Sequence, residues 1–130
     1  MSFKEWKISS TVIEPVELVG EVFDLKAVAI FFDEFGKKYR KRMHVDTKSD
    51  VTIIPLSFAR LLGLKFEVKA RVNGSEGYLS KVKVRIGEKE FVTAVFCESI
   101  GKSHILGVKT LQEFSRIEVD FKNRLLRLHY

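Results

Sequence analysis

Residues 43–55 read Met-His-Val-Asp-Thr-Lys-Ser-Asp-Val-Thr-Ile-Ile-Pro and place an acid between two apolar runs. The first run alternates with polar residues and ends at Val45, and the second begins at Val51. Alternation of this kind is typical of a half-buried β-strand. The pair Asp46-Thr47 is therefore predicted to lie in a tight turn between two strands, which would hold the carboxylate rigidly. Two such acids, brought together by a dimer axis, can perform acid–base chemistry that one alone cannot.

The rest of the chain also predicts mainly strands, with β-branched and aromatic residues grouped between turn residues. Strands are expected at 19–32 (one or two), 37–45, 64–72, 82–86, 91–97, 116–121 and 124–130. One short helix is expected to have Pro55 as its first residue and to stop at Gly63. A second is expected at 108–114. The fold class is therefore all-β with one or two short helices.

The composition fits one packed domain. The chain has 130 residues, of which 45% are hydrophobic, and a formal net charge of +6. Cys97 is the single cysteine, so no disulfide can form within the chain and a reducing compartment, the cytoplasm, is expected. The N-terminus does not resemble a signal peptide, and the longest apolar run, near 27–32, is too short to cross a bilayer. Charged residues make up 31% of the chain while Asn and Gln are few, a pattern that favours a thermophilic source.

Three motifs in order resemble the retropepsin-like aspartic proteases, the single-domain relatives of retroviral proteases. They are the 45–55 segment, Leu61-Leu62-Gly63-Leu64, and Ile105-Leu106-Gly107 with the apolar residues that follow it. The resemblance covers residues 18–130 and implies a closed β-barrel of the retropepsin type. Residues 1–17 are then expected to be an N-terminal extension that adds a strand.

The resemblance assigns a role to each matching residue. It implies that Asp46 is the catalytic aspartate and that the hydroxyl of Thr47 bonds across a dimer axis to the partner loop. Lys48, Ser49 and Asp50 complete the active-site loop. The support beneath this loop would be Ile105, Leu106 and Gly107. The flap that closes over substrate would be Asn73, Gly74, Ser75, Glu76, Gly77 and Tyr78.

Some family members pair an acid at the position of Asp50 with an Arg directly after Ile-Leu-Gly. In this chain that position is Val108, so the ion pair is absent or is replaced by one with Lys109.

The chemistry of the site requires two chains. Two carboxylates about 3 Å apart share a single proton, so that one activates a water while the other protonates the peptide carbonyl. A chain with one such motif must pair with itself, which predicts a C2 homodimer acting on a peptide or protein substrate. No metal and no other cofactor is expected, since His44, His104 and His129 lack ligand spacing.

Lys48 departs from the family pattern, which has Gly at this position. In a dimer, two ammonium groups near the two Asp46 carboxylates would favour ionisation of both acids and remove the shared proton. The alternative function is therefore a catalytically impaired dimer that serves as a peptide-binding or assembly module. If the Lys48 side chain points away, the site can work.

Three features also have simpler interpretations than the protease pattern. Asp46 could be a turn acid that caps its own loop, and Cys97 is expected to be a core thiol. The basic run 37–42 raises a third function, a basic β-barrel that binds nucleic acid. Strand alternation splits its charges between two faces, so a solvated edge strand is the preferred interpretation and nucleic-acid binding is not expected.

Overall fold

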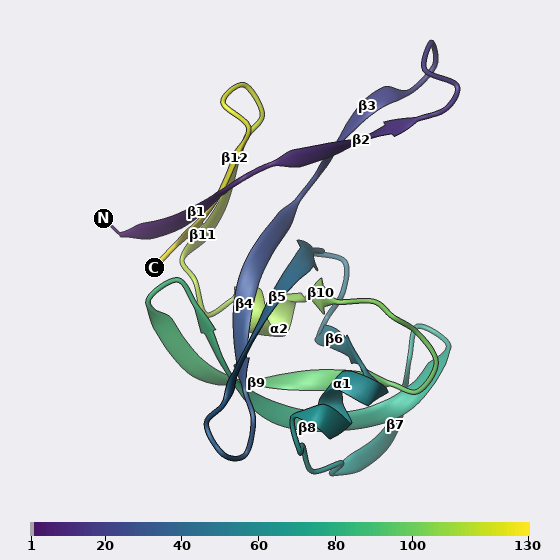
Figure 1. Cartoon of the computed structure of the whole chain (residues 1–130), viewed down its shortest axis with the longest axis vertical. Coiled ribbons are helices and arrows are strands. Elements are labelled where there is room, and N and C mark those ends of the chain that lie inside the picture. Colours follow the sequence, from purple (N-terminus) through teal and green to yellow (C-terminus); the bar gives the residue numbers. More distant parts are fainter. Residues whose placement is uncertain (1) are drawn as a thin grey trace.

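The structure is a computed structural model that describes residues 2–130, which form twelve strands and two short helices (Figure 1). The strands are β1 (Phe3–Lys7), β2 (Ser9–Ile13), β3 (Gly20–Asp24), β4 (Lys26–Phe32), β5 (Lys38–Val45), β6 (Thr52–Pro55), β7 (Val68–Val72), β8 (Ser75–Ile86), β9 (Lys89–Glu98), β10 (Ile105–Leu106), β11 (Arg116–Asp120) and β12 (Leu125–His129). The helices are α1 (Leu56–Leu61) and α2 (Val108–Leu111). The mostly β architecture predicted from the sequence is confirmed.

The main sheet has the strand order β4-β5-β10-β6-β9-β8-β7. Its longest ladder joins β8 to β9, from Gly77 opposite Glu98 to Ile86 opposite Lys89. Most neighbours are antiparallel, but β6 runs parallel to β9 and β10 runs parallel to β5. A further two-residue pairing connects β4 with β8. The closed barrel expected from the sequence goes beyond these pairings and stays a prediction.

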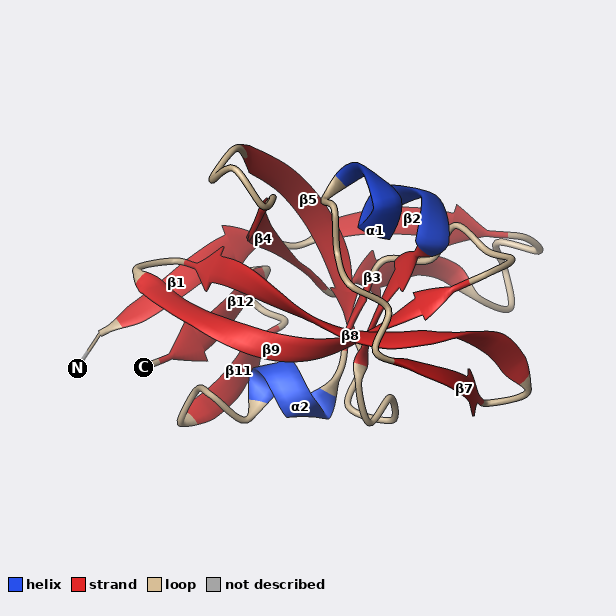
Figure 2. Cartoon of the chain, turned by 90° about the horizontal axis from the view of Figure 1, so that it is seen from below, coloured by secondary structure: helices blue, strands red, loops and turns tan. Residues whose placement is uncertain are grey.

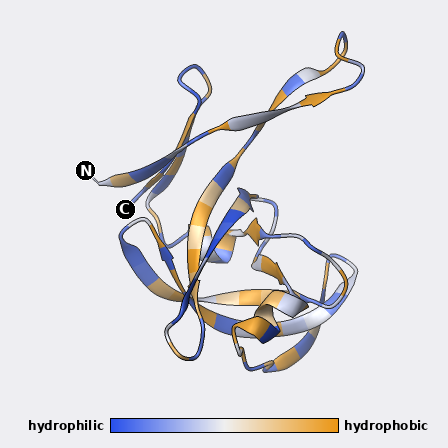
Figure 3. Ribbon diagram, viewed as in Figure 1, coloured by the Kyte–Doolittle hydropathy of each residue, from blue (hydrophilic) through white to orange (hydrophobic). Residues whose placement is uncertain are grey.

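Alternation along the strands builds the core. In β8 the side chains of Val82, Val84 and Ile86 are buried while Lys81 and Lys83 are exposed, as a period of two requires. Figure 3 shows the same apolar character along β4 and β9. The two helices lie on opposite sides of the long β8–β9 pair, as Figure 2 shows.

Aromatic side chains fix α1 to the sheet. The ring of Phe58 in α1 packs edge-on against Phe31 of β4 with centroids 5.3 Å apart. Both rings are buried, and burial of a Phe side chain stabilises a fold by about 1.5–3 kcal/mol. The ammonium of Lys41, which interrupts the apolar face of β5, lies 4.6 Å from the Phe58 ring centroid. This cation–π contact explains how a lysine is accommodated at that position.

The N-terminal segment contributes to two smaller sheets. β1 pairs with β12 in the order β1-β12-β11, and β2 pairs with β3 in a hairpin that projects from the body (Figure 1). The domain boundary at residue 17 stays a prediction. No helix among residues 2–130 is long and apolar enough to cross a membrane.

Three local expectations were wrong. The strand predicted at 64–72 begins only at Val68, because Leu64 donates its N–H to Ala59 O at the end of α1 and Phe66 stacks on Tyr78 with centroids 5.1 Å apart. These contacts draw residues 64–66 out of the ladder, while Glu67 still donates its N–H to Leu79 O of β8 at 3.0 Å.

The other two concern helix ends. Pro55 is extended (φ −64°, ψ 145°) and pairs with Glu98, so it ends β6 and precedes α1 as its N-cap instead of opening the helix. α2 ends at Leu111 and not at residue 114, since Glu113 and Phe114 donate to the carbonyls three residues before them, in 3₁₀-type turns.

Candidate active site

Asp46 lies in a turn between β5 and β6 whose geometry is set by its own carboxylate. The Oδ1 atom accepts a hydrogen bond from the backbone N–H of Lys48 at 2.8 Å, and the Asp46 carbonyl accepts one from Ser49 N–H at 3.3 Å. The backbone N–H of Asp46 donates to Leu106 O at 3.0 Å. The carboxylate is half-buried and fixed in direction, as the sequence predicted for an acid on a tight turn.

The C-terminal part of the loop is attached to the start of α2. Val108 N–H donates to Ser49 O at 2.8 Å, and Lys109 N–H donates to Asp50 O at 2.9 Å. Ser49 is buried, and its hydroxyl donates to Val51 O at 2.7 Å. Backbone hydrogen bonds therefore fix the loop to a segment more than fifty residues further along the chain.

Gly107 makes this close approach possible. A Cβ atom at this position would collide with the carbonyl of Val51 and lie 2.8 Å from Ser49 O. Its φ is −96°, so glycine is needed here for space and not for an unusual backbone conformation. The predicted support residues Ile105, Leu106 and Gly107 are thus brought directly against the Asp46 loop.

Three buried threonine hydroxyls lie beneath this junction. The Thr110 hydroxyl contacts that of Thr52 at 2.5 Å and that of Thr93 at 2.8 Å. The Thr52 hydroxyl also accepts the N–H of Gly107 at 3.1 Å. This threonine network could not be predicted from local sequence, because its members come from β6, β9 and α2.

The exposed side chains of the loop point to solvent. Thr47, Lys48 and Asp50 are all exposed. Across residues 2–130, no salt bridge within 4.0 Å involves Lys48, Asp50 or Lys109. The link between Asp50 and Lys109 is made by their backbones.

The predicted flap is the β7–β8 hairpin. Asn73 and Gly74 form its turn with φ values of 51° and 82°, a conformation that Asn and Gly tolerate best. An ion pair between Arg71 and Glu76 at 2.9 Å bridges the two strands just below the turn. None of residues 73–78 lines the cavity beside Asp46, so one chain does not bring the hairpin and the aspartate around a common space.

An open cavity of about 730 Å³ adjoins Asp46. Its wall includes Lys26, Arg42, His44, Lys102, His104 and the aspartate itself. Arg42 and His44 are two residues apart in β5 and therefore share one face of the strand. The contributions of β4 and of the segment before β10 depend on strand pairing and could not be read from local sequence.

The fold was compared with known proteins. No protein-family model and no curated protein sequence matches the chain. Among solved structures it is similar to a retropepsin-like aspartic protease from Rickettsia conorii (TM-score 0.57, 23% identity, 98% of this chain and 91% of that chain). It is also similar to the retroviral protease-like domain of Ddi1 from Leishmania major (TM-score 0.57, 14% identity, 83% and 94%).

A third similar structure is the EIAV protease in complex with the inhibitor HBY-793, with a TM-score of 0.53 and 14% identity over 69% of this chain and 86% of that chain. At these identities the likeness concerns the fold. The chain therefore has the fold of the retropepsin-like aspartic proteases, as its three sequence motifs predicted.

Proposed function

We propose that the protein is a homodimeric aspartic peptidase in which two Asp46 side chains, one from each chain, form the catalytic pair. The observation that carries this proposal is the fixed Asp46 carboxylate, held at 2.8 Å by Lys48 N–H on a loop attached to Leu106. A carboxylate with a locked direction is what a shared-proton pair requires, because catalytic geometry tolerates little displacement.

In the proposed reaction the ionised carboxylate takes a proton from a water, whose oxygen attacks the peptide carbonyl carbon. The protonated carboxyl donates its proton to the carbonyl oxygen, which gives a neutral tetrahedral diol. Transfer of a proton to the peptide nitrogen then lets the C–N bond break. The attack needs one ionised and one protonated carboxyl group. A single Asp46 side chain cannot be the proton acceptor and the proton donor at the same time.

A free sheet edge beside the loop supports the dimer. β11 is the last strand in the order β1-β12-β11, so within residues 2–130 one of its edges has no strand partner. A cavity of about 240 Å³ is lined by Thr47 together with Arg116 and Ile117 of β11, which places this edge next to the Asp46 loop. Unpaired strand edges favour pairing with another chain. In the proposal the two β11 edges meet near the axis, and the Thr47 hydroxyls bond across it.

The position of Lys48 supports activity over the impaired alternative. Its backbone N–H makes the bond to Asp46 that the loop needs, while its side chain is exposed and has no ion pair with a carboxylate in the described chain. Its φ is not positive either, so the loop accepts a residue other than glycine without backbone strain. In the proposed dimer the flap hairpins at 73–78 close over an extended peptide.

A subunit-mixing experiment tests the proposal. Wild-type chain is mixed with Asp46→Asn chain, dissociated in mild urea and refolded, and cleavage of a denatured casein substrate is measured. If every site needs both aspartates, an equal mixture keeps about one quarter of the activity of the same total amount of wild type, because random pairing leaves that share of wild-type dimers. Glu67→Gln, a change at an exposed acid outside the site, serves as the matched control and keeps full activity in the mixture.

Retention of half of the activity in the equal mixture would show that each chain works alone, which contradicts the proposal. Sedimentation at micromolar concentration gives an independent reading, since a chain that stays monomeric cannot form the pair. Full activity of pure Asp46→Asn would remove the aspartate from the mechanism altogether.

A further inference from the structure

The cavity beside Asp46 gathers positive charge. Lys26, Arg42 and Lys102 line it together with two imidazoles, and Asp46 is the only acid that residues 2–130 contribute to its wall. This basic wall lies next to Asp46, whose carboxylate is proposed to act on the peptide bond. The side chains that flank the bond in a bound peptide would therefore face it.

Strand pairing explains why these groups share one face. Lys26 of β4 lies directly opposite His44 of β5, and Arg42 lies two residues before His44, so the period of two puts all three on one side. The intervening side chains, Ala27 and Met43, are buried on the other side.

A backbone contact adds the third cation. The N–H of His44 donates to the carbonyl of His104 at 3.0 Å, which brings the 102–104 segment alongside the end of β5. The Nδ1 atom of His104 donates to Lys102 O at 3.2 Å, and its Nε2 is buried without a hydrogen-bond partner. Burial and, second, the charge of Lys41 lower the pKa of His104, so this imidazole is neutral at neutral pH. The lysines and the arginine supply the permanent positive charge of the cavity.

These three cations have no counter-ion in residues 2–130. No carboxylate forms a salt bridge within 4.0 Å of Lys26, Arg42 or Lys102. Some other basic side chains of the sheets are paired, as Lys83 is with Glu90 at 3.2 Å and Arg127 with Glu118 at 3.1 Å. Unpaired like charges around one concave space repel each other, and an anionic ligand relieves this repulsion.

We propose that this cavity binds an aspartate or glutamate side chain of the peptide beside the bond that is cut, so that the protein selects acidic substrates. The inference rests on the proposed function, because the peptide carbonyl must lie at Asp46. The volume of about 730 Å³ falls in the range of ligand pockets, about 300–1,000 Å³, and exceeds what one acidic side chain needs. Nucleic acid is the less favoured occupant, since Asp46 in the wall would repel a continuous phosphate backbone.

The test uses peptides that differ only by Glu or Gln at the residues flanking the cleaved bond. At a pH near 5.5 to 6 a free Glu side chain is ionised, its ordinary pKa being about 4.3. Wild type is expected to cleave the Glu peptide with kcat/KM about tenfold higher, the size expected for one charge-assisted hydrogen bond. Lys26→Gln and Arg42→Gln, made singly and together, are expected to lower this ratio towards one.

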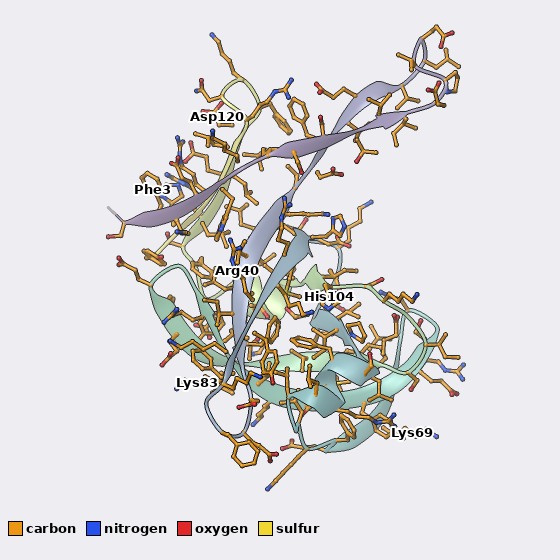
Figure 4. The ribbon with its side chains drawn as sticks, viewed as in Figure 1. Phe3, Arg40, Lys69, Lys83, His104 and Asp120 are labelled. Atoms are coloured by element: carbon orange, nitrogen blue, oxygen red, sulfur yellow. The ribbon has the colours of Figure 1, made fainter. Side chains whose placement is uncertain are left out.

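Lys122→Gln is the matched control, because it removes an exposed lysine in the β11–β12 turn and should keep the ratio. Figure 4 shows Asp120, which begins this turn, far from His104 at the cavity. The double charge reversal Lys26→Glu with Arg42→Glu is expected to turn the preference towards a Lys peptide. This second result does not depend on the absolute activity of the variants.

The outcomes separate the two proposals. Equal cleavage of the Glu and Gln peptides by wild type overturns the acidic selectivity and leaves the peptidase standing. If no peptide is cleaved, binding is measured by fluorescence anisotropy with the same peptides. Tighter binding of the Glu peptide then supports the cavity while the catalytic proposal fails. Tighter binding of a single-stranded oligonucleotide than of the Glu peptide overturns the inference.

Discussion

The backbone N–H of Gly107 donates a hydrogen bond to the hydroxyl of Thr52 at 3.1 Å, across 55 residues of sequence. This bond joins the strand that follows Asp46 to the turn that supports it. The Thr52 hydroxyl is also 2.5 Å from that of Thr110, so one buried oxygen serves both the loop and α2. The orientation of the aspartate therefore depends on a residue that does not touch it.

Replacement of Thr52 by valine should be costly although the two side chains have nearly the same shape. Thr52→Val leaves the buried Gly107 N–H without its partner and takes from the Thr110 hydroxyl one of its two threonine partners, which costs about 1–3 kcal/mol of unfolding free energy. Urea denaturation followed by fluorescence of Trp6 measures this change.

The control for this variant is Thr11→Val, which removes an exposed hydroxyl bond to Asp24 of 2.9 Å. Its loss should be much smaller, because water replaces the missing partner. Equal losses in the two variants would mean that the buried threonine network does not hold the loop.

Gly107→Ala should disturb the loop by crowding. The added methyl group meets the Val51 carbonyl and lies 2.8 Å from Ser49 O, both of them backbone atoms that cannot move independently. Gly74→Ala is the matched comparison, since a Cβ there meets nothing within 4 Å but the φ of +82° is unfavourable for alanine. That conformational cost is about 1–2 kcal/mol. Gly107→Ala should lower the urea midpoint further than Gly74→Ala, and a smaller effect would show that the loop adapts.

Much of this architecture follows from local sequence. The Asp46 turn and the helix stop at Gly63 depend on neighbours in the chain, and the structure has both where they were predicted. Gly63 and Gly74 have positive φ values of 71° and 82°, which glycine adopts without the strain of a side chain.

The remainder depends on contacts between distant segments. The threonine network joins β6, β9 and α2, and the basic wall joins β4, β5 and the segment before β10. Residues 64–67 alternate like a strand. The hydrogen bond from Leu64 to α1 and the stacking of Phe66 on Tyr78 override that pattern. Periodicity predicts which face of a strand a side chain occupies, but it does not predict which other strand pairs with that strand.

The thiol of Cys97 should be unreactive in the folded protein. The side chain is buried in β9, and burial raises its pKa to about 11. At pH 8 the native thiol is therefore protonated and shielded, and a disulfide reagent such as DTNB should label it only as the chain opens. Labelling over a urea series should follow the unfolding curve measured by fluorescence. Rapid labelling without urea would contradict the burial of this strand.

Protonation of Glu118 should lower the stability of the protein in acid. Its carboxylate accepts a hydrogen bond from His129 Nε2 at 2.7 Å and one from Arg127 at 3.1 Å, and Arg127 also bonds to Glu5. The His129 bond, followed by the charges of Arg127 and Arg116, lowers the pKa of Glu118 from its ordinary value near 4.5.

Because the folded pKa is the lower one, the stabilisation is complete above the unfolded pKa and is lost as the pH falls through the folded value. Glu118→Gln should thus lower the urea midpoint at pH 7 and flatten its decline below about pH 4.5. Glu67→Gln, which alters an exposed acid outside every ion pair found in residues 2–130, should leave the decline as in wild type. Parallel declines in wild type and Glu118→Gln would exclude this carboxylate as the cause.

Lys48 decides between an active and an impaired site, and three substitutions separate the ways in which it can act. Lys48→Gly removes the side chain but keeps the backbone N–H that bonds to Asp46 at 2.8 Å. Lys48→Gln keeps the length and removes the charge, and Lys48→Arg keeps both. Because the side chain is exposed and unpaired among residues 2–130, we expect all three to cleave peptides with kcat/KM within about threefold of wild type, a change below 1 kcal/mol in barrier height. If Lys48→Gly and Lys48→Gln both gain acid-side activity that wild type and Lys48→Arg lack, the ammonium group suppresses the shared proton and the natural protein is a binding module. If only Lys48→Gly gains activity, bulk and not charge closes the site, and the exposed placement of the lysine does not persist in the dimer.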